Sequence, residues 1–333
     1  MSCSCGRAIE DDFSFCPSCG AEVGGRNSSR SASFCRTFRE CAEWTFGRLV
    51  LGWRSGIPLR EDTVSEVNLQ GIYLSHRDRV SVRRFSPREE SHAGADWEWW
   101  FHVGGRGFGL RVQAKRASRD NSYPLRHKVG GRLQNDLLIE DAVAAGCLPM
   151  YVLYNHDKRL PQMPSAGCAH SPDTPRLRGC SIVSGLTVRR ALADEARPHV
   201  YTRKHSIPWN EIVCGDDTDG SLLELVHDRV RELHWKGLGQ VADLPEDRLQ
   251  WGERPGGLDQ SLSKFVTGAT LDSTRSADLL EDRRLRELAR IAARPTRSRL
   301  PGRVLEMIDR PEAEAPDARI THTVIVNLAP GRG

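Results

Sequence analysis

The amino-acid sequence predicts an α/β fold in which a mixed β-sheet is flanked by helices. Between residues 60 and 155, apolar residues recur with helical spacing, then with the alternation of strands, then again with helical spacing. A short, wholly apolar run at residues 148–154 follows, which is typical of a buried strand. The chain is 38% hydrophobic, which is enough to form a buried core.

The elements of this region are predicted in the order helix, three strands, helix, strand. Residues 63–75 have apolar residues at helical spacing and an acid in the first turn. Val80 and Val82 alternate with polar residues, and the segment 97–103 is rich in aromatic residues, so both segments predict strands. The glycines of residues 104–107 predict a hairpin turn. We expect helices at 63–75 and 129–145, and strands at 79–85, 97–103, 108–115 and 148–154.

The 333 residues fall into four parts by composition. A cysteine-rich module and a linker rich in Ser and Arg precede the regular region, and the end of the chain is rich in Gly, Arg and Pro. The predicted parts are a zinc ribbon at 1–24, a linker and short helix at 25–59, the main domain at 60–215, and a helical extension with an irregular tail at 216–333. Within the last part we expect helices at 222–233 and 279–292, and a strand at 321–328 whose partner the sequence does not identify.

The sequence contains no candidate membrane span, because no run of about 20 mainly apolar residues is present. The N-terminus lacks the basic and apolar regions of a signal peptide. We therefore expect a cytoplasmic protein, whose ten cysteines are metal ligands or free thiols rather than disulfides. The formal net charge of +4 is too small to indicate a nucleic-acid partner by itself.

Three residues with the chemistry of phosphodiester cleavage converge on two neighbouring strands. Asp96 stands at the start of one strand, and Gln113 and Lys115 share a face at the end of the next, so a hairpin brings them together. Asp96 can bind Mg²⁺ or Mn²⁺, and the cation lowers the pKa of the attacking water. Lys115 can orient that water or stabilise the charged transition state. The alternatives are a lysine that keeps a strand edge soluble and a glutamine that is a core amide.

Asp96 followed by Gln113-Ala114-Lys115 resembles the PD-(D/E)xK nuclease signature in its Gln-x-Lys variant, as in Mrr-type restriction endonucleases. The predicted order of elements is similar to the αβββαβ core of that superfamily. The segments 94–100 and 149–155 resemble an uncharacterised bacterial family that carries this core. The resemblance covers about residues 60–215, and it implies a restriction-endonuclease-like fold with Asp96 as the principal magnesium ligand.

Gln113 stands where the signature has an acid, and an amide is a poorer metal ligand than a carboxylate, so the resemblance implies a second acid. Mrr-like cores often place a helical glutamate beside the site, which favours Glu66, with Glu90 ranked second. Glu98 shares the face of Asp96 but lies about 7 Å further along the strand. The alternative for Glu66 is an acid that complements the helix macrodipole.

Basic residues gather around the lysine of the motif. Residues 103–133 contain eight arginines and lysines and one acid, Asp120. Such an excess beside an acidic metal site suits a nucleic-acid backbone, and a solvated loop is the alternative. The predicted nucleic-acid contacts are Arg116, Arg119, Arg126, Lys128 and Gln134, the last by resemblance to nucleases in which a polar residue on this helix touches the substrate.

Four cysteines near the N-terminus predict a structural Zn²⁺ site: Cys3, Cys5, Cys16 and Cys19. Four thiolates at close spacing suit tetrahedral zinc, and about 20 residues cannot form a core without metal. Free thiols are the alternative, because one residue rather than two separates the first pair.

The first functional hypothesis is a metal-dependent nuclease that hydrolyses phosphodiester bonds, with DNA as the favoured substrate. The superfamily resemblance implies a role in restriction or anti-phage defence. The alternatives are a catalytically inactive nucleic-acid-binding or regulatory module on the same fold, and a scaffold that binds other proteins. Whether the protein acts as a homodimer is left open.

Overall fold

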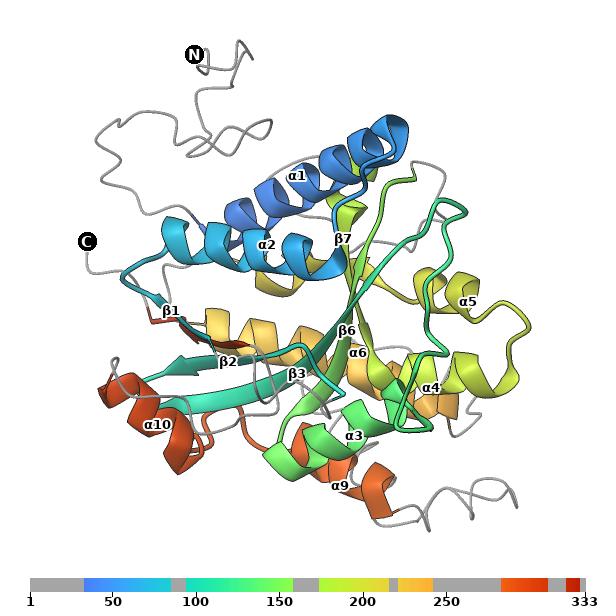
Figure 1. The fold of residues 1–333 in the computed structure, drawn as a ribbon. Coiled ribbons are helices and arrows are strands. Elements are labelled where there is room, and N and C mark those ends of the chain that lie inside the picture. The colour runs from blue at the N-terminus through green and yellow to red at the C-terminus, as the bar shows by residue number, and fades with distance from the viewer. Residues whose placement is uncertain are drawn as a thin grey trace, which may run out of the picture.

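A seven-stranded mixed β-sheet forms the centre of the computed structural model (Figure 1). The structure describes residues 33–84, 94–157, 174–215, 221–241, 283–310 and 322–329, so the predicted zinc ribbon lies outside the described residues. The strand order is β1-β9-β2-β3-β6-β7-β8. The strands are β1 (Val80–Arg84), β2 (Trp97–Val103), β3 (Arg106–Arg116), β6 (Leu148–Tyr154), β7 (Cys180–Ser184), β8 (Ile207–Pro208) and β9 (His322–Asn327). The predicted α/β class, with a mixed sheet flanked by helices, is confirmed.

Helices flank the sheet on both sides. They are α1 (Phe34–Ser55), α2 (Glu61–Ser75), α3 (Gln134–Ala145), α4 (Gly185–Asp194), α5 (Pro198–Lys204), α6 (Leu222–Val241), α9 (Arg283–Ala292) and α10 (Gly302–Asp309). The helix predicted at 63–75 begins two residues earlier, at Glu61. No helix among these described segments is long and apolar enough to cross a membrane.

The structure confirms the predicted hairpin turn but not the predicted start of α3. Gly104 and Gly105 join β2 to β3 with φ angles of 58° and 74°, which favour glycine in tight hairpin turns, as predicted. The helix predicted from residue 129 begins only at Gln134. The preceding residues form a second hairpin, β4 (Lys128–Val129) and β5 (Arg132–Leu133), because Gly130 and Gly131 turn the chain with positive φ.

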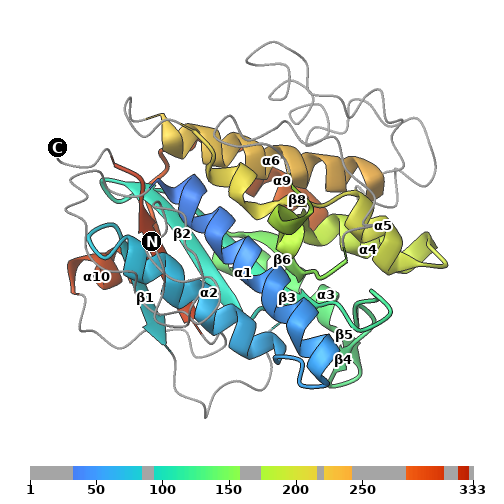
Figure 2. The ribbon, with the colours of Figure 1, turned by 90° about the horizontal axis from the view of Figure 1, so that it is seen from above.

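A different set of helices packs on each face of the sheet. Trp99 and Val112 lie in one core cluster with residues of α1, α2 and α6. Trp100 and Tyr151 point to the other face, where they pack with residues of α3, α4 and α10. Figures 1 and 2 show α1 and α2 side by side across the first face. Because side chains alternate between the two faces of a strand, Gln113 and Lys115 lie on the face that α3 covers.

The strand predicted near the end of the chain is an interior strand of the sheet. β9 lies between β1 and β2, antiparallel to β1 and parallel to β2. Val324 and Val326 belong to the main core, together with Leu285 and Leu288 of α9. The part of the chain that the sequence analysis treats as an extension beyond residue 215 therefore supplies part of the central sheet and core.

Candidate active site

Asp96 and Gln113 meet at the start of β2, as the predicted hairpin requires. The Asp96 backbone N–H donates to the carbonyl oxygen of Val112, the ladder partner of Trp97, at 2.8 Å. The Asp96 carboxylate then accepts two hydrogen bonds at Oδ2, from Gln113 Nε2 at 2.7 Å and from the Ala114 N–H at 2.8 Å. These bonds hold the carboxylate against the end of β3.

Gln134 extends this hydrogen-bonded chain to α3. Its Nε2 donates to Gln113 Oε1 at 2.7 Å, and both amides are buried. Gln134 is the first residue of α3, whose start is fixed by the β4–β5 hairpin before it. The structure therefore brings Asp96, Gln113 and Gln134 together, in the order carboxylate, amide, amide.

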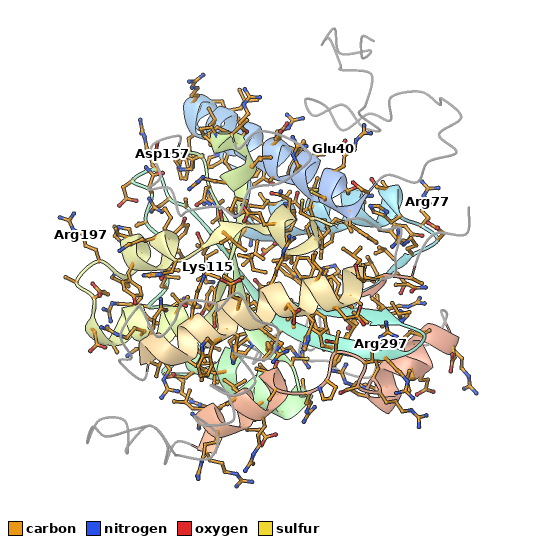
Figure 3. The ribbon with its side chains drawn as sticks, turned by 180° about the vertical axis from the view of Figure 1, so that it is seen from behind. Glu40, Arg77, Lys115, Asp157, Arg197 and Arg297 are labelled. Atoms are coloured by element: carbon orange, nitrogen blue, oxygen red, sulfur yellow. The ribbon has the colours of Figure 1, made fainter. Side chains whose placement is uncertain are left out.

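Lys115 lies in the interior and pairs with a glutamate that the sequence analysis did not select. Figure 3 shows Lys115 near the middle of the molecule. Its Nζ is 3.4 Å from Glu61 Oε1, and the lysine side chain is 6% exposed. The other oxygen of Glu61 accepts the backbone N–H of Arg116 at 2.7 Å. The N-terminal turn of α2 therefore places a second carboxylate beside the lysine of the motif.

The acids ranked from the sequence do not occupy this position. Glu66 is exposed on α2, because five residues along a helix turn a side chain by about 140° from the direction of Glu61. Glu90 lies outside the described residues. Glu98 is buried in a separate ion cluster, where Arg303 of α10 donates to both its oxygens at 2.6 and 2.9 Å and Arg111 lies 3.4 Å away.

Burial makes the Asp96 carboxylate costly to ionise. Burial raises the pKa of Asp96 to about 7, the positive charge of Lys115 lowers it, and the negative charge of Glu61 raises it. The contrast is Glu98, where burial also favours the neutral acid, but Arg303 and Arg111 outweigh it and lower the pKa. Of Asp96 and Glu98, Asp96 is therefore the residue whose ionised form an additional cation would stabilise more.

The oxygen donors at this position fit a hard divalent cation. Asp96 and Glu61 offer two carboxylates near one lysine, and Mg²⁺ is commonly bound by one or two carboxylates with water completing its shell. Among the described residues there is no cluster of three or more acidic, histidine or cysteine side chains suited to a metal ion. Gln113 presents its amide nitrogen to Asp96, so its oxygen faces Gln134 instead.

The loop that follows β3 carries exposed basic residues on an ordered backbone. The Ser122 N–H and hydroxyl donate to Asp120 Oδ1 at 3.3 and 2.9 Å, and the Ser118 hydroxyl donates to the same oxygen. The Tyr123 hydroxyl donates to Asn155 at the end of β6. These bonds tie the loop to the sheet, so Arg119 projects from a defined surface beside the site.

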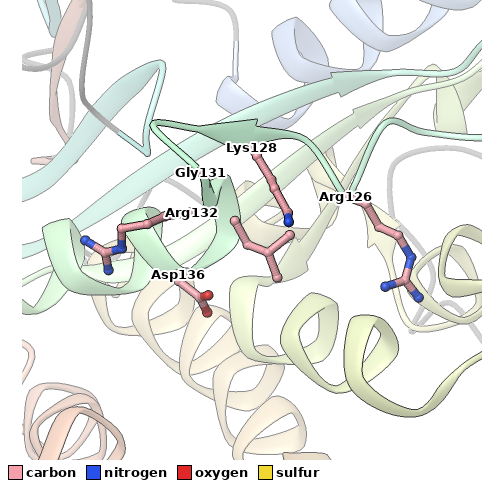
Figure 4. Close-up of a pocket in the computed structure, with 6 residues that line it drawn as sticks. Arg126, Lys128, Gly131, Arg132 and Asp136 are labelled. Atoms are coloured by element: carbon pink, nitrogen blue, oxygen red, sulfur yellow. The ribbon is translucent and has the colours of Figure 1, made fainter.

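A hollow of about 550 Å³ lies between this loop and α3 (Figure 4). It is lined by Arg126, Lys128, Gly131, Arg132, Leu133 and Asp136. Arg126 and Lys128 form no ion pair with other described residues, so their charges are available to an anion. The hollow adjoins the cluster around Asp96, because Leu133 directly precedes Gln134.

Sequence reasoning missed two residues of this region, Glu61 and Trp53. Glu61 precedes the predicted start of the helix, although an acid at a helix N-terminus after Pro58 is a recognisable signal. Trp53 falls in the predicted short helix, where nothing in the local pattern separates a core tryptophan from one beside a site. The Arg116 guanidinium carbon lies 5.0 Å from the centre of its ring.

Fold and site together define an α/β protein with a buried cluster of acid, amide and lysine at one end of its two central hairpin strands. The chain belongs to the family of unknown function DUF6615, whose model matches residues 34–326. The match begins at α1 and reaches β9, so it includes every element of the sheet. A comparison with curated proteins gives no match.

Proposed function

We propose that this protein is a metal-dependent nuclease that hydrolyses phosphodiester bonds, with DNA as the favoured substrate. One observation carries the proposal. At the start of β2 and the end of β3, Gln113 is hydrogen-bonded to Asp96 and Lys115 is ion-paired with Glu61, and the charges of this ion pair act on the Asp96 carboxyl. Two carboxylates beside a sequestered ammonium group are the functional groups that metal-assisted phosphodiester hydrolysis needs.

The order of elements supports a restriction-endonuclease-like core. Apart from the small β4–β5 hairpin, the chain runs α2, β1, β2, β3, α3, β6, which is the αβββαβ order that the sequence resemblance implies. β3 and β6 are parallel neighbours, and the motif residues stand on β3 at the end where this pairing stops. β9, inserted between β1 and β2, is an addition to that order.

Each residue of the cluster has a role in this proposal. Asp96 and Glu61 would hold the divalent cation, which when bound would lower the pKa of the attacking water and neutralise charge on the phosphate. Gln113 and Gln134 orient Asp96 through their hydrogen bonds. Lys115 stabilises the negative charge that develops on the phosphate. Arg119, Arg126 and Lys128 attract the nucleic-acid backbone to the same side of the molecule.

A catalytically inactive nucleic-acid-binding module is the second candidate, and one observation favours it. Gln113 Nε2 donates to Asp96, so the residue at the usual acid position offers no oxygen to a cation there. On this alternative the basic surface binds nucleic acid without turnover. Both candidates predict binding that weakens steeply with salt, and only the first predicts products.

Cleavage that depends on a divalent cation and on Asp96 separates the two candidates. Plasmid and single-stranded DNA are incubated with the protein and Mg²⁺, Mn²⁺ or EDTA. Asp96→Asn should abolish cleavage, whereas Asp309→Asn, at an exposed site on α10, should leave it unchanged. Intact DNA with folded wild-type protein in both metals would reject the nuclease and leave the binding module.

We also propose that Cys3, Cys5, Cys16 and Cys19 bind one structural Zn²⁺. The support is the spacing of the four cysteines in the sequence. Purified protein should contain about one zinc per chain, and Cys16→Ser with Cys19→Ser should remove it, as elemental analysis measures. Full zinc content in the double variant would reject this ligand set.

The resemblance to restriction endonucleases further supports a role in anti-phage defence.

A further inference from the structure

Three side chains from distant parts of the chain gather beside the candidate active site. Trp53, in the last turn of α1, lies under the Arg116 guanidinium carbon at 5.0 Å from its ring centre. The His156 ring, beyond the end of β6, lies 5.9 Å from the Trp53 ring at an angle of 52°. The His156 Nε2 is 2.9 Å from the Ser118 carbonyl oxygen, which ties this ring to the loop after β3.

This cluster adjoins the residues proposed to act on the phosphate. Glu61 connects the two groups, because one of its oxygens is 3.4 Å from Lys115 Nζ and the other accepts the Arg116 backbone N–H at 2.7 Å. Trp53, Arg116 and His156 are each partly exposed. A group bound against the Trp53 and His156 rings would therefore lie near the Glu61 carboxylate, which pairs with Lys115.

Two polar atoms of the cluster lack hydrogen-bond partners. Trp53 Nε1 and Arg116 Nη1 are buried, and neither finds an acceptor within the described parts of the chain. A buried donor without an acceptor is costly, and most buried polar groups in proteins are paired.

The surface around Trp53 combines apolar and cationic side chains. Ile57, just beyond the end of α1, is 77% exposed, which is unusual for so large an apolar residue. Arg54 at the end of α1, Arg60 just before α2 and Arg119 in the loop after β3 are also exposed. Aromatic rings among cations are the usual means of binding single-stranded nucleic acid, because a base stacks on the ring while the cations hold the backbone.

We propose that Trp53, Arg116 and His156 form a stacking site for an unpaired nucleobase next to the phosphate that is cleaved. This inference rests on the proposed function for the position of that phosphate. It assigns the substrate class as single-stranded nucleic acid, or a duplex with an unpaired nucleotide at the cleaved position. A fully paired duplex keeps its bases stacked in the helix, so it cannot use this site.

The test measures binding without cleavage. Fluorescence anisotropy follows a labelled single strand and a matched hairpin duplex in EDTA, with wild-type protein, Trp53→Leu and Trp53→Phe. Trp53→Leu should weaken single-strand binding about tenfold and leave duplex binding unchanged, because it keeps apolar packing but loses base stacking. Trp53→Phe should retain most of the affinity.

Trp44→Leu is the matched control. Trp44 is also partly buried on α1 and also packs near an arginine, with the Arg48 guanidinium carbon 5.9 Å from its ring. It lies nine residues before Trp53, about 14 Å along the helix at the usual rise. Single-strand binding by Trp44→Leu should match that of the wild type, and circular dichroism should show both variants folded.

Three results would overturn the stacking site. They are unchanged single-strand affinity in Trp53→Leu, an equal loss in Trp44→Leu, and wild-type protein that binds the duplex as tightly as the single strand. The result does not depend on catalysis, since EDTA removes the cation. Absence of metal-dependent cleavage would reject the nuclease, and a Trp53-dependent preference for single strands would still support the stacking site.

Discussion

At the scale of single residues, Asp96 is the group whose environment most clearly indicates a function. Its carboxyl is removed from water, receives two hydrogen bonds at one oxygen, and lies near both a positive and a negative side chain. Burial raises its pKa to about 7, so near neutral pH the folded protein holds this group between its two protonation states. Perturbed acids of this kind are common at functional sites.

The raised pKa of Asp96 predicts a dependence of stability on pH. The folded state binds this proton more tightly than the unfolded chain, so the stabilisation is present below about pH 4 and is lost as the pH rises through about 7. Asp96→Asn should therefore raise the free energy of unfolding near pH 8 by on the order of 2 kcal/mol, with little change near pH 4. Urea unfolding at both pH values measures this.

Two controls accompany that measurement. Asp309→Asn, at an exposed site, should change the free energy of unfolding little at either pH. Mg²⁺ or Mn²⁺ should stabilise the wild type near pH 8 more than it stabilises Asp96→Asn, because the cation favours the ionised carboxylate. An Asn variant that is less stable than the wild type near pH 8 would contradict the account of this residue.

Most of the cluster could be predicted from the sequence, because side chains alternate regularly between the two faces of a strand. Gln113 and Lys115 share a face in any strand, and a hairpin through Gly104 brings them to Asp96. Gln134 was expected near the site only through the resemblance, as a contact to nucleic acid. Glu61 was not selected, because it precedes the helix expected at 63–75 and so was not considered as a helical side chain.

At the scale of elements, the start of α2 determines which glutamate reaches the site. Glu61 stands in its first turn and contacts both Lys115 and the Arg116 backbone. Glu61→Gln keeps an acceptor for the backbone N–H but removes the charge, so metal-dependent cleavage should fall about 10- to 100-fold. Glu66→Gln, on an exposed face of the same helix, should cleave like the wild type. Initial rates on plasmid and single-stranded DNA decide between them, and a larger loss in Glu66→Gln than in Glu61→Gln would contradict the assignment of Glu61 to the site.

At the scale of the whole molecule, the sheet depends on a strand from the far end of the chain. The local elements were predictable, since β6 coincides with the predicted strand at 148–154 and β2 with that at 97–103. The position of β9 was not, because hydrophobic alternation identifies a strand without its neighbours. Its interior position follows from pairing with β1 and β2, which lie more than 200 residues earlier.

This topology predicts that residues 60–215 do not fold alone. The fragment lacks β9, which separates β1 from β2, and it lacks α1, α6 and α9, whose apolar residues fill the main core. It should show no cooperative urea transition by circular dichroism. A chain that begins at Ser33 and continues to the end should unfold cooperatively, because it keeps all seven strands. A cooperative transition in the fragment would contradict the interior position of β9.

The cleavage rate of Lys115→Met tests the central claim most directly. Lys115 is almost fully buried and pairs with Glu61, so its ammonium has no role in solubility. With Mg²⁺ present, Lys115→Met should cut DNA about 100- to 1,000-fold more slowly than the wild type. Lys236→Met removes a lysine that pairs with Glu232 on the surface of α6, and it should cut at the wild-type rate. Equal rates in wild type and a folded Lys115→Met would contradict the proposal that this cluster is the active site of a nuclease.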